Sequence, residues 1–279
     1  MNNPLQNVAL NQYFIRHGRI WLVGSGLALL HLVLTWRLMQ QVDQVAINAL
    51  FWLAILGTLI NHGFNVRYDR RAYVFGLLLL GAIVAKSLTV AHPEAWFVRL
   101  FPALAVVSLG LLISGFHLKR HWRAGVLLIP LLLPRGLLEQ AAESTFGKPL
   151  QVLTAQVAAF VLHYIGFDTS QRHTTIIVNH GAVDVLFRCT GMPLLILLSQ
   201  LALLFFVMFP LHSTQRMRII ILAVLISFLL SSLRVALMAL VVTDPIAFAY
   251  WHGGNGSQIF STGAIVLFGW LCQRVLPRV

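Results

Sequence analysis

Long apolar runs separated by short polar segments dominate the chain. An α-helix needs about 20 apolar residues to cross the hydrocarbon core of a bilayer, so each run of that length predicts a transmembrane helix. The runs lie near residues 20–40, 45–62, 73–91, 97–116, 123–138, 191–211, 217–243 and 257–275. The fifth run is short and contains Pro130 and Pro134, which free backbone groups that neighbouring helices must satisfy. The pattern predicts eight spans.

The run Leu150–Phe167 has a different character, because polar side chains interrupt it. The polar residues are Gln151, Thr154, Gln156 and His163. Apolar residues recur at helical spacing at Leu153, Val157, Phe160, Val161 and Tyr164. This pattern is typical of a helix that lies in the membrane interface. A ninth span remains the alternative.

The segment that follows this run predicts a small β-hairpin before Cys189. Thr174–Asn179 and Val183–Phe187 are rich in β-branched residues, and His180-Gly181 between them is typical of a turn. The fold class is therefore an all-α integral membrane protein with one interfacial helix and one hairpin-like segment. We expect a single polytopic domain, residues 1–279, with five spans in 1–149 and the interfacial helix and last three spans in 150–279.

Basic residues predict the orientation of these spans. If Leu150–Phe167 does not cross, they all fall on one side of the membrane, which the positive-inside rule assigns to the cytoplasm. They are Arg16, Arg19, Arg67, Arg70, Arg71, Lys119, Arg120, Arg123, Arg216, Arg218, Arg274 and Arg278. Both termini are then cytoplasmic. No small-residue cleavage site follows the first run, which predicts an uncleaved span.

Composition excludes two other classes of protein. The chain is 58% hydrophobic and 10% charged, with a mean hydropathy of +0.82, whereas a soluble domain carries about a quarter charged residues. The net charge of +12 would suggest a nucleic-acid partner in a soluble protein. Here the basic residues flank apolar runs, so we expect no nucleic-acid partner. Two cysteines are too few for a disulfide framework, and Cys272 is interpreted as a packing residue.

Three polar residues stand out by their position along the spans. Cys189 precedes the sixth span, Arg234 lies within the seventh, and His252 precedes the eighth. Arg234 is 17 residues beyond Met217, which is about 25 Å along a helix. The hydrocarbon core is about 30 Å thick, so this topology brings all three residues to the outer membrane boundary.

Each of these residues alone has an ordinary explanation. A cysteine is often a small buried hydrophobe, an arginine can snorkel to the interface, and a loop histidine is usually solvated. Together they form a complete set for nucleophilic catalysis. A histidine can deprotonate the thiol and later protonate a leaving amine, while a guanidinium stabilises the oxyanion and lowers the thiol pKa. Arg188 is a candidate helper because it adjoins Cys189.

At these residues the chain resembles the exosortase/archaeosortase family of membrane transpeptidases. That family shows Cys-small-Gly at the start of one span, Asn-x-x-Arg in the next, and a histidine before the last. The matching residues here are Cys189-Thr190-Gly191, Ser231-Ser232-Leu233-Arg234 and His252. Thr190 replaces the usual serine, and Ser231 replaces the usual asparagine and offers fewer hydrogen bonds. The resemblance is sharpest over Leu150–Gln273.

Three further stretches resemble the cyanobacterial branch, the cyanoexosortases. They are Tyr250-Trp251-His252-Gly253, the Gly256–Ser261 stretch after it, and Leu50–Ala54.

The resemblance implies a specific activity. Such enzymes recognise exported proteins that end in a short PEP-like motif, a hydrophobic span and a basic tail. They cut near the motif, hold the substrate as a thioester on cysteine, and transfer it to an envelope amine or other acceptor. The implied catalytic residues are Cys189, Arg234 and His252. Ser231, Arg188, Thr190 and Gly191 are supporting candidates, and no cofactor or metal is implied.

Three other functions remain as alternatives. A transporter or channel would use Lys86 and Arg234 along a polar path, although paired interrupted helices are not evident. A metalloenzyme would use histidines, but their spacing is loose for a metal site. The histidines in question are His163, His173, His180 and His252. A non-catalytic membrane scaffold is the third alternative.

Overall fold

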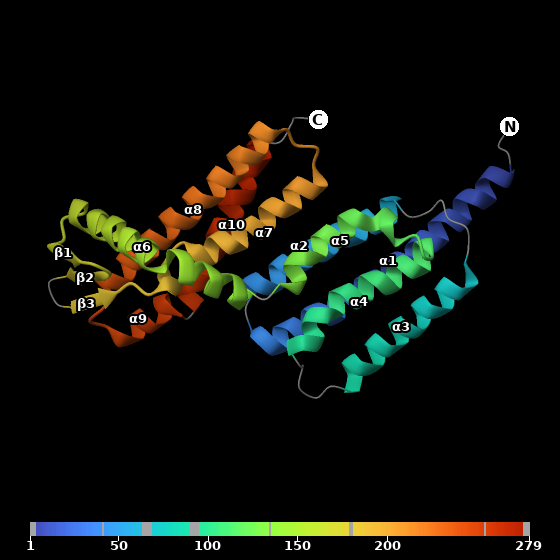
Figure 1. The fold of residues 1–279 in the computed structure, drawn as a ribbon, viewed down its shortest axis with the longest axis horizontal. Coiled ribbons are helices and arrows are strands. Elements are labelled where there is room, and N and C mark those ends of the chain that lie inside the picture. Colours follow the sequence, from blue (N-terminus) through green and yellow to red (C-terminus); the bar gives the residue numbers. More distant parts are fainter. Residues whose placement is uncertain are drawn as a thin grey trace. The chain divides into compact units, whose positions relative to one another are not determined.

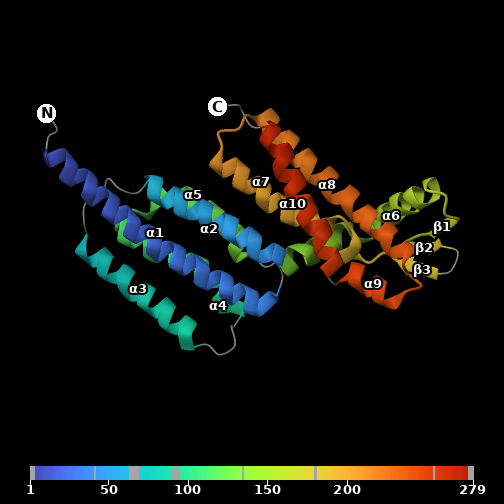
Figure 2. The same ribbon diagram turned by 180° about the vertical axis from the view of Figure 1, so that it is seen from behind.

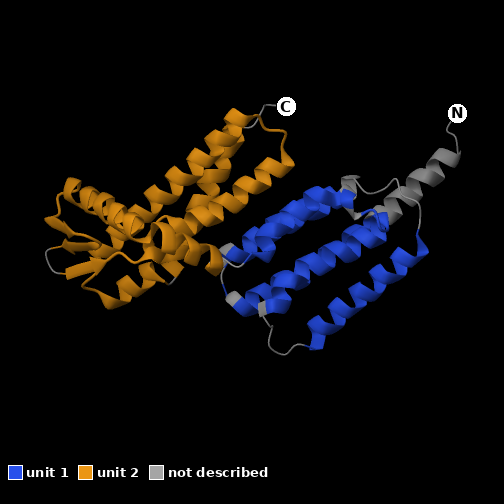
Figure 3. Cartoon of the chain, viewed as in Figure 1, with its two compact units in different colours: residues 1–134 blue, residues 135–279 orange. Residues whose placement is uncertain are grey.

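A computed structural model describes residues 4–40, 42–62, 69–89, 95–133, 135–178, 181–253 and 255–275. The chain is mostly helical, with one small sheet, and divides into two compact units (Figure 3). Unit 1 comprises residues 1–134 and unit 2 comprises residues 135–279. All of the candidate catalytic residues belong to unit 2.

Unit 1 is a helical bundle in which α4 packs against α1, α3 and α5 (Figure 1). Its helices are α1 (Pro4–Met39), α2 (Val42–His62), α3 (Arg70–Thr89), α4 (Ala95–Ser114), the 3₁₀ helix η1 (Leu118–His121) and α5 (Trp122–Leu132). Small residues let α3 and α4 approach closely, since the Ser108 hydroxyl donates to the Gly76 carbonyl at 2.8 Å. Such contacts are typical of helix pairs in membranes.

The predicted fifth span, 123–138, is not a single helix. α5 ends at Leu132, and Leu133 adopts an extended conformation with φ −75° and ψ 121°. The reason is Pro134, because a proline disfavours helical geometry at the residue before it. The next helix, α6 (Arg135–Tyr164), is continuous through Pro149. The boundary between the two units falls at 134/135 in the chain, whereas the sequence predicted a single domain with parts 1–149 and 150–279.

Unit 2 contains a bundle of three helices, α7, α8 and α10, which lie side by side (Figures 1 and 2). α6 packs along α8 and also contacts the sheet. The remaining elements are β1 (Thr169–Arg172), β2 (Thr175–Val178), β3 (Gly181–Asp184), the 3₁₀ helix η2 (Phe187–Cys189), α7 (Met192–Met208), α8 (Ser213–Leu240), α9 (Pro245–His252) and α10 (Asn255–Val275).

The three strands form an antiparallel sheet in the order β1-β2-β3. Strands β2 and β3 correspond to the predicted hairpin, with Ile176 opposite Val183 and both side chains buried. In the predicted turn at His180-Gly181, His180 lies outside the described residues. Gly181 is the first residue of β3. Strand β1 was not predicted, because its polar residues Thr169–Arg172 lack the apolar–polar alternation of a half-buried strand.

Among the described residues, four helices are long and apolar enough to cross a membrane, or five if α5 and α6 count as one span. The four are Ile20–Leu38, Arg70–Thr89, Trp96–Ser114 and Ser213–Leu240. Two more apolar helices, Gln44–Leu59 and Met192–Met208, are shorter than this. The 17 residues of Met192–Met208 span about 26 Å, against a hydrocarbon core of about 30 Å. Thus the protein has several candidate spans, and the predicted number of eight is not confirmed.

The buried face of α6 consists mainly of alanines. Ala155, Ala158, Ala159 and Leu162 recur at helical spacing and pack in one cluster with Val235, Ala236 and Ala239 of α8. The larger residues Leu153, Phe160 and Tyr164, which suggested an amphipathic helix, are exposed. The close fit of α6 against α8 supports the sheet and η2, and so positions Cys189.

Candidate active site

Cys189 is the last residue of η2, and a compact turn holds it in place. Its main-chain N–H donates to the Leu186 carbonyl at 2.9 Å. The Thr190 hydroxyl donates to the Phe187 carbonyl at 2.7 Å and accepts from the N–H of Met192 at 3.4 Å. The Cys189 side chain is only 4% exposed. Thr190 therefore contributes through its hydroxyl to the link between η2 and α7.

Gly191 allows the start of α7 to approach the backbone of α8. A Cβ at this position would lie 2.9 Å from the Cα of Phe228 and 3.0 Å from the carbonyl oxygen of Ser227. Both are backbone atoms and cannot turn aside as a flexible side chain does. The third residue of the Cys-Thr-Gly motif is thus required by packing.

We expect Gly191→Ala to lower the free energy of unfolding by about 1–3 kcal/mol, as is usual when an atom is forced into a packed site. Thermal unfolding of the detergent-solubilised protein measures this change. Gly263→Ala in α10 is the matched control, since a Cβ there meets nothing within 4 Å. Equal stability of the two variants would contradict the packing argument.

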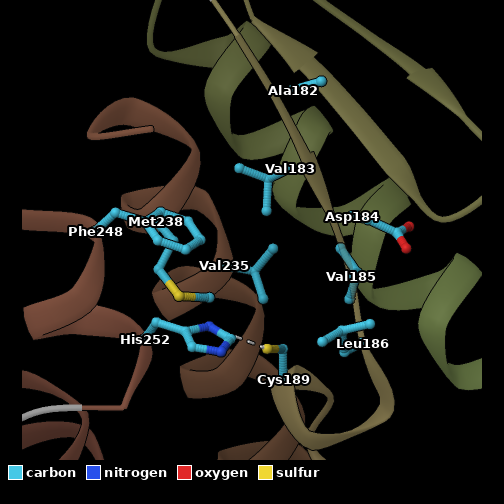
Figure 4. A pocket seen from close by; sticks show the side chains of 10 residues that line it. All are labelled: Ala182, Val183, Asp184, Val185, Leu186, Cys189, Val235, Met238, Phe248 and His252. Atoms are coloured by element: carbon cyan, nitrogen blue, oxygen red, sulfur yellow. Dashed lines mark hydrogen bonds between the residues drawn. The ribbon is translucent and has the colours of Figure 1, made fainter. Parts of the chain in front are cut away.

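His252 reaches Cys189 from the end of the short helix α9. The carboxylate of Asp244 caps this helix by accepting hydrogen bonds from the N–H groups of Ile246 and Ala247. The imidazole stacks on Phe248, with ring centroids 5.5 Å apart and an angle of 12° between the planes. Its Nδ1 lies 3.9 Å from the Sγ of Cys189 (Figure 4). The structure therefore brings together a thiol and an imidazole that are 63 residues apart in sequence.

Arg234 approaches the same region from α8. Its Nη2 donates to the main-chain carbonyl of Arg188 at 3.4 Å. Its Nε is buried and has no hydrogen-bond partner among the described residues. Buried donors are normally paired in folded proteins, so this unpaired Nε–H is unusual. Ser231 is buried one turn earlier on α8, while the side chain of Arg188 is exposed.

Burial raises the pKa of the Cys189 thiol, and the charge and hydrogen bonding of the Arg234 guanidinium partly offset this effect. The thiol is consequently protonated at neutral pH. A protonated thiol is a poor nucleophile, so its reaction requires a base within reach. The imidazole of His252 satisfies that geometric requirement.

We expect Arg234→Gln to raise the pKa of Cys189 further, because the cation that favours the thiolate is removed. Alkylation of Cys189 by iodoacetamide should then be slower, and its pH–rate profile should shift to higher pH. Arg218→Gln, an exposed arginine on the same helix, is the control and should leave the profile unchanged. An unshifted profile in Arg234→Gln would exclude this electrostatic role.

A cavity of about 250 Å³ adjoins the thiol and the imidazole (Figure 4). Its walls come from β3 with the residues after it, from α8 and from α9. The lining residues are Ala182, Val183, Asp184, Val185, Leu186, Cys189, Val235, Met238, Phe248 and His252. Arg234 is not one of the described residues that line it. The side chains that line the cavity are mostly apolar.

The residues that form the walls of this cavity were not predicted from the sequence. Phe248 precedes His252 by four residues, so helical spacing was a signal that the two rings would stack. Val235 and Met238 gave no such signal, since they belong to a continuous apolar run. Their role follows only from the packing of α8 against the sheet.

The structure gives no support to the alternative functions. Among the described residues, no group of three or more His, Cys, Asp or Glu side chains is arranged to hold a metal ion. His163, His173 and His252 are among the described residues, whereas His180 lies outside them. The Lys86 ammonium of the transporter hypothesis lies 6.0 Å from the ring centroid of Trp96.

Comparison with known proteins identifies the family. The family model described as "Transmembrane exosortase (Exosortase_EpsH)" matches residues 27–269, which include every candidate site residue. No curated protein and no solved structure matched the chain. The match covers most of the sequence and confirms the family that the sequence resembles. The chain therefore belongs to the transmembrane exosortase family.

Proposed function

We propose that this protein is a membrane cysteine endopeptidase and transpeptidase that uses Cys189, His252 and Arg234. The single observation that carries the proposal is the 3.9 Å approach of the Cys189 Sγ to the His252 Nδ1 at the wall of a 250 Å³ cavity. Membership of the exosortase family supports the same conclusion for the protein as a whole.

The proposed reaction has two halves. In the first, Nδ1 of His252 takes the thiol proton as Sγ attacks the scissile carbonyl, and the positive charge of the Arg234 guanidinium stabilises the developing oxyanion. Collapse of the tetrahedral intermediate breaks the C–N bond, and the imidazolium gives its proton to the leaving amine. The products are a thioester on Cys189 and a free amino end on the released tail.

In the second half, an acceptor attacks the thioester. An envelope amine forms a new amide and restores the thiol, while water instead gives a carboxylic acid. His252 again takes the proton of the attacking group and returns it to the cysteine sulfur. Both outcomes conserve atoms and need no redox partner. No step uses a metal or an organic cofactor.

The proposed substrates are exported proteins with a PEP-like motif, a hydrophobic span and a basic tail. Their span would lie in the bilayer beside the enzyme, which suits a site at the extracytoplasmic face. We propose eight spans with cytoplasmic termini in the inner membrane. The exposed apolar residues Leu153, Phe160 and Tyr164 support an interfacial position for α6. Assignment to the cyanobacterial branch is part of this proposal.

The proposal is tested by mass spectrometry on the full-length protein in lipid vesicles with a synthetic tailed substrate. We expect an adduct on Cys189 whose mass equals the substrate segment before the cleavage site, and hydroxylamine should release it because thioesters react with strong nucleophiles. Cys272 is the internal control, since it is fully buried on α10. Substrate cleavage without any adduct on Cys189, or no cleavage at all, would overturn the proposal.

A further inference from the structure

Strand β3 has a free edge, because the sheet order places it last. The main-chain N–H of Val185 donates to the Thr174 carbonyl at 2.9 Å, and Val183 lies opposite Ile176. Hydrogen-bonded pairs alternate along an antiparallel ladder, so the main-chain groups of Val183 and Val185 face β2. Those of Ala182 and Asp184 must then point away from β2.

These outward groups have no main-chain partner in the part of the chain that the structure describes. No backbone hydrogen bond reaches the N–H or carbonyl of Ala182 or Asp184, or the N–H of Leu186. A strand edge of this kind is a template for another extended chain. The side chains of all three residues are exposed, whereas those of Val183 and Val185 are buried.

The cavity runs along this edge and ends at the candidate nucleophile. It is lined by Ala182 and Asp184 as well as by Val183 and Val185, although these two pairs point their side chains to opposite faces of the sheet. A cavity that touches both sets follows the edge of the strand. The same cavity is lined by Cys189 and His252 (Figure 4).

We propose that the substrate binds as a fourth strand, paired in parallel with the free edge of β3, and that this pairing presents its scissile carbonyl to Cys189. The inference rests on the proposed function and names how that site holds its substrate. The occupant is the extended segment of the exported protein that precedes the cleavage site. Main-chain hydrogen bonds provide the affinity, as in other cases of strand addition.

The direction of pairing follows from the chain path. From Gly181 to Cys189 the enzyme runs toward α7, the apolar helix that begins at Met192. The substrate likewise runs from its exported domain toward its own membrane span. Two chains that approach the membrane side by side run parallel. In a parallel ladder one residue bonds to both neighbours of the residue opposite it.

This geometry assigns four hydrogen bonds. The substrate residue opposite Val183 donates to the carbonyl of Ala182 and accepts from the N–H of Asp184. The residue two positions later donates to the carbonyl of Asp184 and accepts from the N–H of Leu186. The residues between them turn their main-chain groups away from β3. Prolines fit there, since proline occurs in strands where its missing N–H faces outward, and the proposed PEP-like motif alternates proline in this way.

The test is an N-methylation scan of a synthetic tailed substrate against the full-length protein in lipid vesicles. Alanine replaces the prolines of its motif, so that every scanned position carries an N–H that methylation can remove. Methylation removes one N–H at a time, and the readout is the rate of adduct formation on Cys189. We expect sensitivity at every second position, with at least about a tenfold loss at the bonded residues. At the intervening residues the rate should stay within about twofold.

A pair of enzyme variants provides the complementary test. Asp184→Pro removes the outward N–H without removing a bond to β2, whereas Asp184→Ala keeps the N–H and loses only the carboxylate. We expect adduct formation in Asp184→Pro to be at least about threefold slower than in Asp184→Ala. Equal alkylation of Cys189 by iodoacetamide shows that both variants retain the site. If Asp184→Pro fails to fold, the substrate scan, which leaves the enzyme intact, decides.

The outcomes separate the two proposals. If the unmethylated substrate forms the adduct but the scan shows no alternation, strand addition is wrong and the thioester mechanism stands. If the unmethylated substrate forms no adduct on Cys189, the proposed function fails and strand addition fails with it. Alternating sensitivity supports both.

Discussion

Cys189→Ala is expected to abolish both cleavage of a tailed substrate and formation of the covalent adduct. The sulfur is the only atom in the proposed mechanism that bonds to the substrate carbonyl, so nothing replaces it. Removing a nucleophile from a comparable catalytic set lowers the rate on the order of 10⁶-fold. Processing of the substrate in vesicles, followed by gel and mass spectrometry, measures the loss.

The folded state should survive this change. Cys189 is 4% exposed in a cluster that also contains Ala155, Val185 and Val235. Alanine is smaller and apolar, so we expect a cost of about 1 kcal/mol, within the range of ordinary substitutions. Cys189→Ser should likewise be folded and inactive, because a serine hydroxyl is a weaker nucleophile. Cys272→Ala is the matched control and should process substrate normally. Normal processing by both Cys189 variants would rule out a thioester.

His252→Gln is expected to slow adduct formation by about 10²–10⁴-fold, the usual contribution of a general acid–base group. Because burial raises the pKa of Cys189, the thiol loses its proton slowly without the imidazole. The residual rate of the variant should therefore increase with pH as the thiol ionises by itself, so the deficit shrinks in alkaline buffer. A pH–rate profile of adduct formation in vesicles measures both effects.

The controls for this prediction come from the same unit. His252 is exposed at the end of α9, so its replacement should leave thermal stability nearly unchanged. His163→Gln removes an exposed histidine at the end of α6 and should retain full activity. Added imidazole should partly restore His252→Ala, since the vacated position is open to solvent. A His252→Gln enzyme with wild-type rates at neutral pH is incompatible with the proposed base.

The predictable features of the site were those carried by local sequence. The Cys-Thr-Gly motif marked the start of a helix, and the structure confirms a helix that begins at Met192. The β-branched residues in Val183–Phe187 indicated a strand, and the structure contains β3 (Gly181–Asp184), which overlaps the start of this stretch. By contrast, the break before Pro134 divided a predicted span, because a single proline outweighed the apolar character of the run around it.

Other features of the fold could not be predicted from the sequence, because they depend on which faces of the helices pack against one another. The sequence pattern of α6 drew attention to Leu153, Phe160 and Tyr164, but the alanine face packs against α8. Large apolar residues in a membrane protein are not forced inward, since lipid is as apolar as a core. Which side chains are buried between helices in a membrane protein depends on how closely the helices pack rather than on hydrophobicity. Small residues allow the closest packing. Hydrophobic periodicity therefore identified the helix and not its buried side.

By itself the sequence determined that this is a largely helical membrane protein. It also determined that one cysteine, one arginine and one histidine lie near the ends of its last helices. Hydropathy and short motifs are properties of neighbouring residues, and they need no knowledge of tertiary contacts. Only the tertiary structure decided that Sγ of Cys189 lies 3.9 Å from Nδ1 of His252, and that Arg234 reaches the carbonyl of Arg188. Lateral distances between helices depend on which small residues allow close approach, and the order of apolar residues along the chain does not specify that choice.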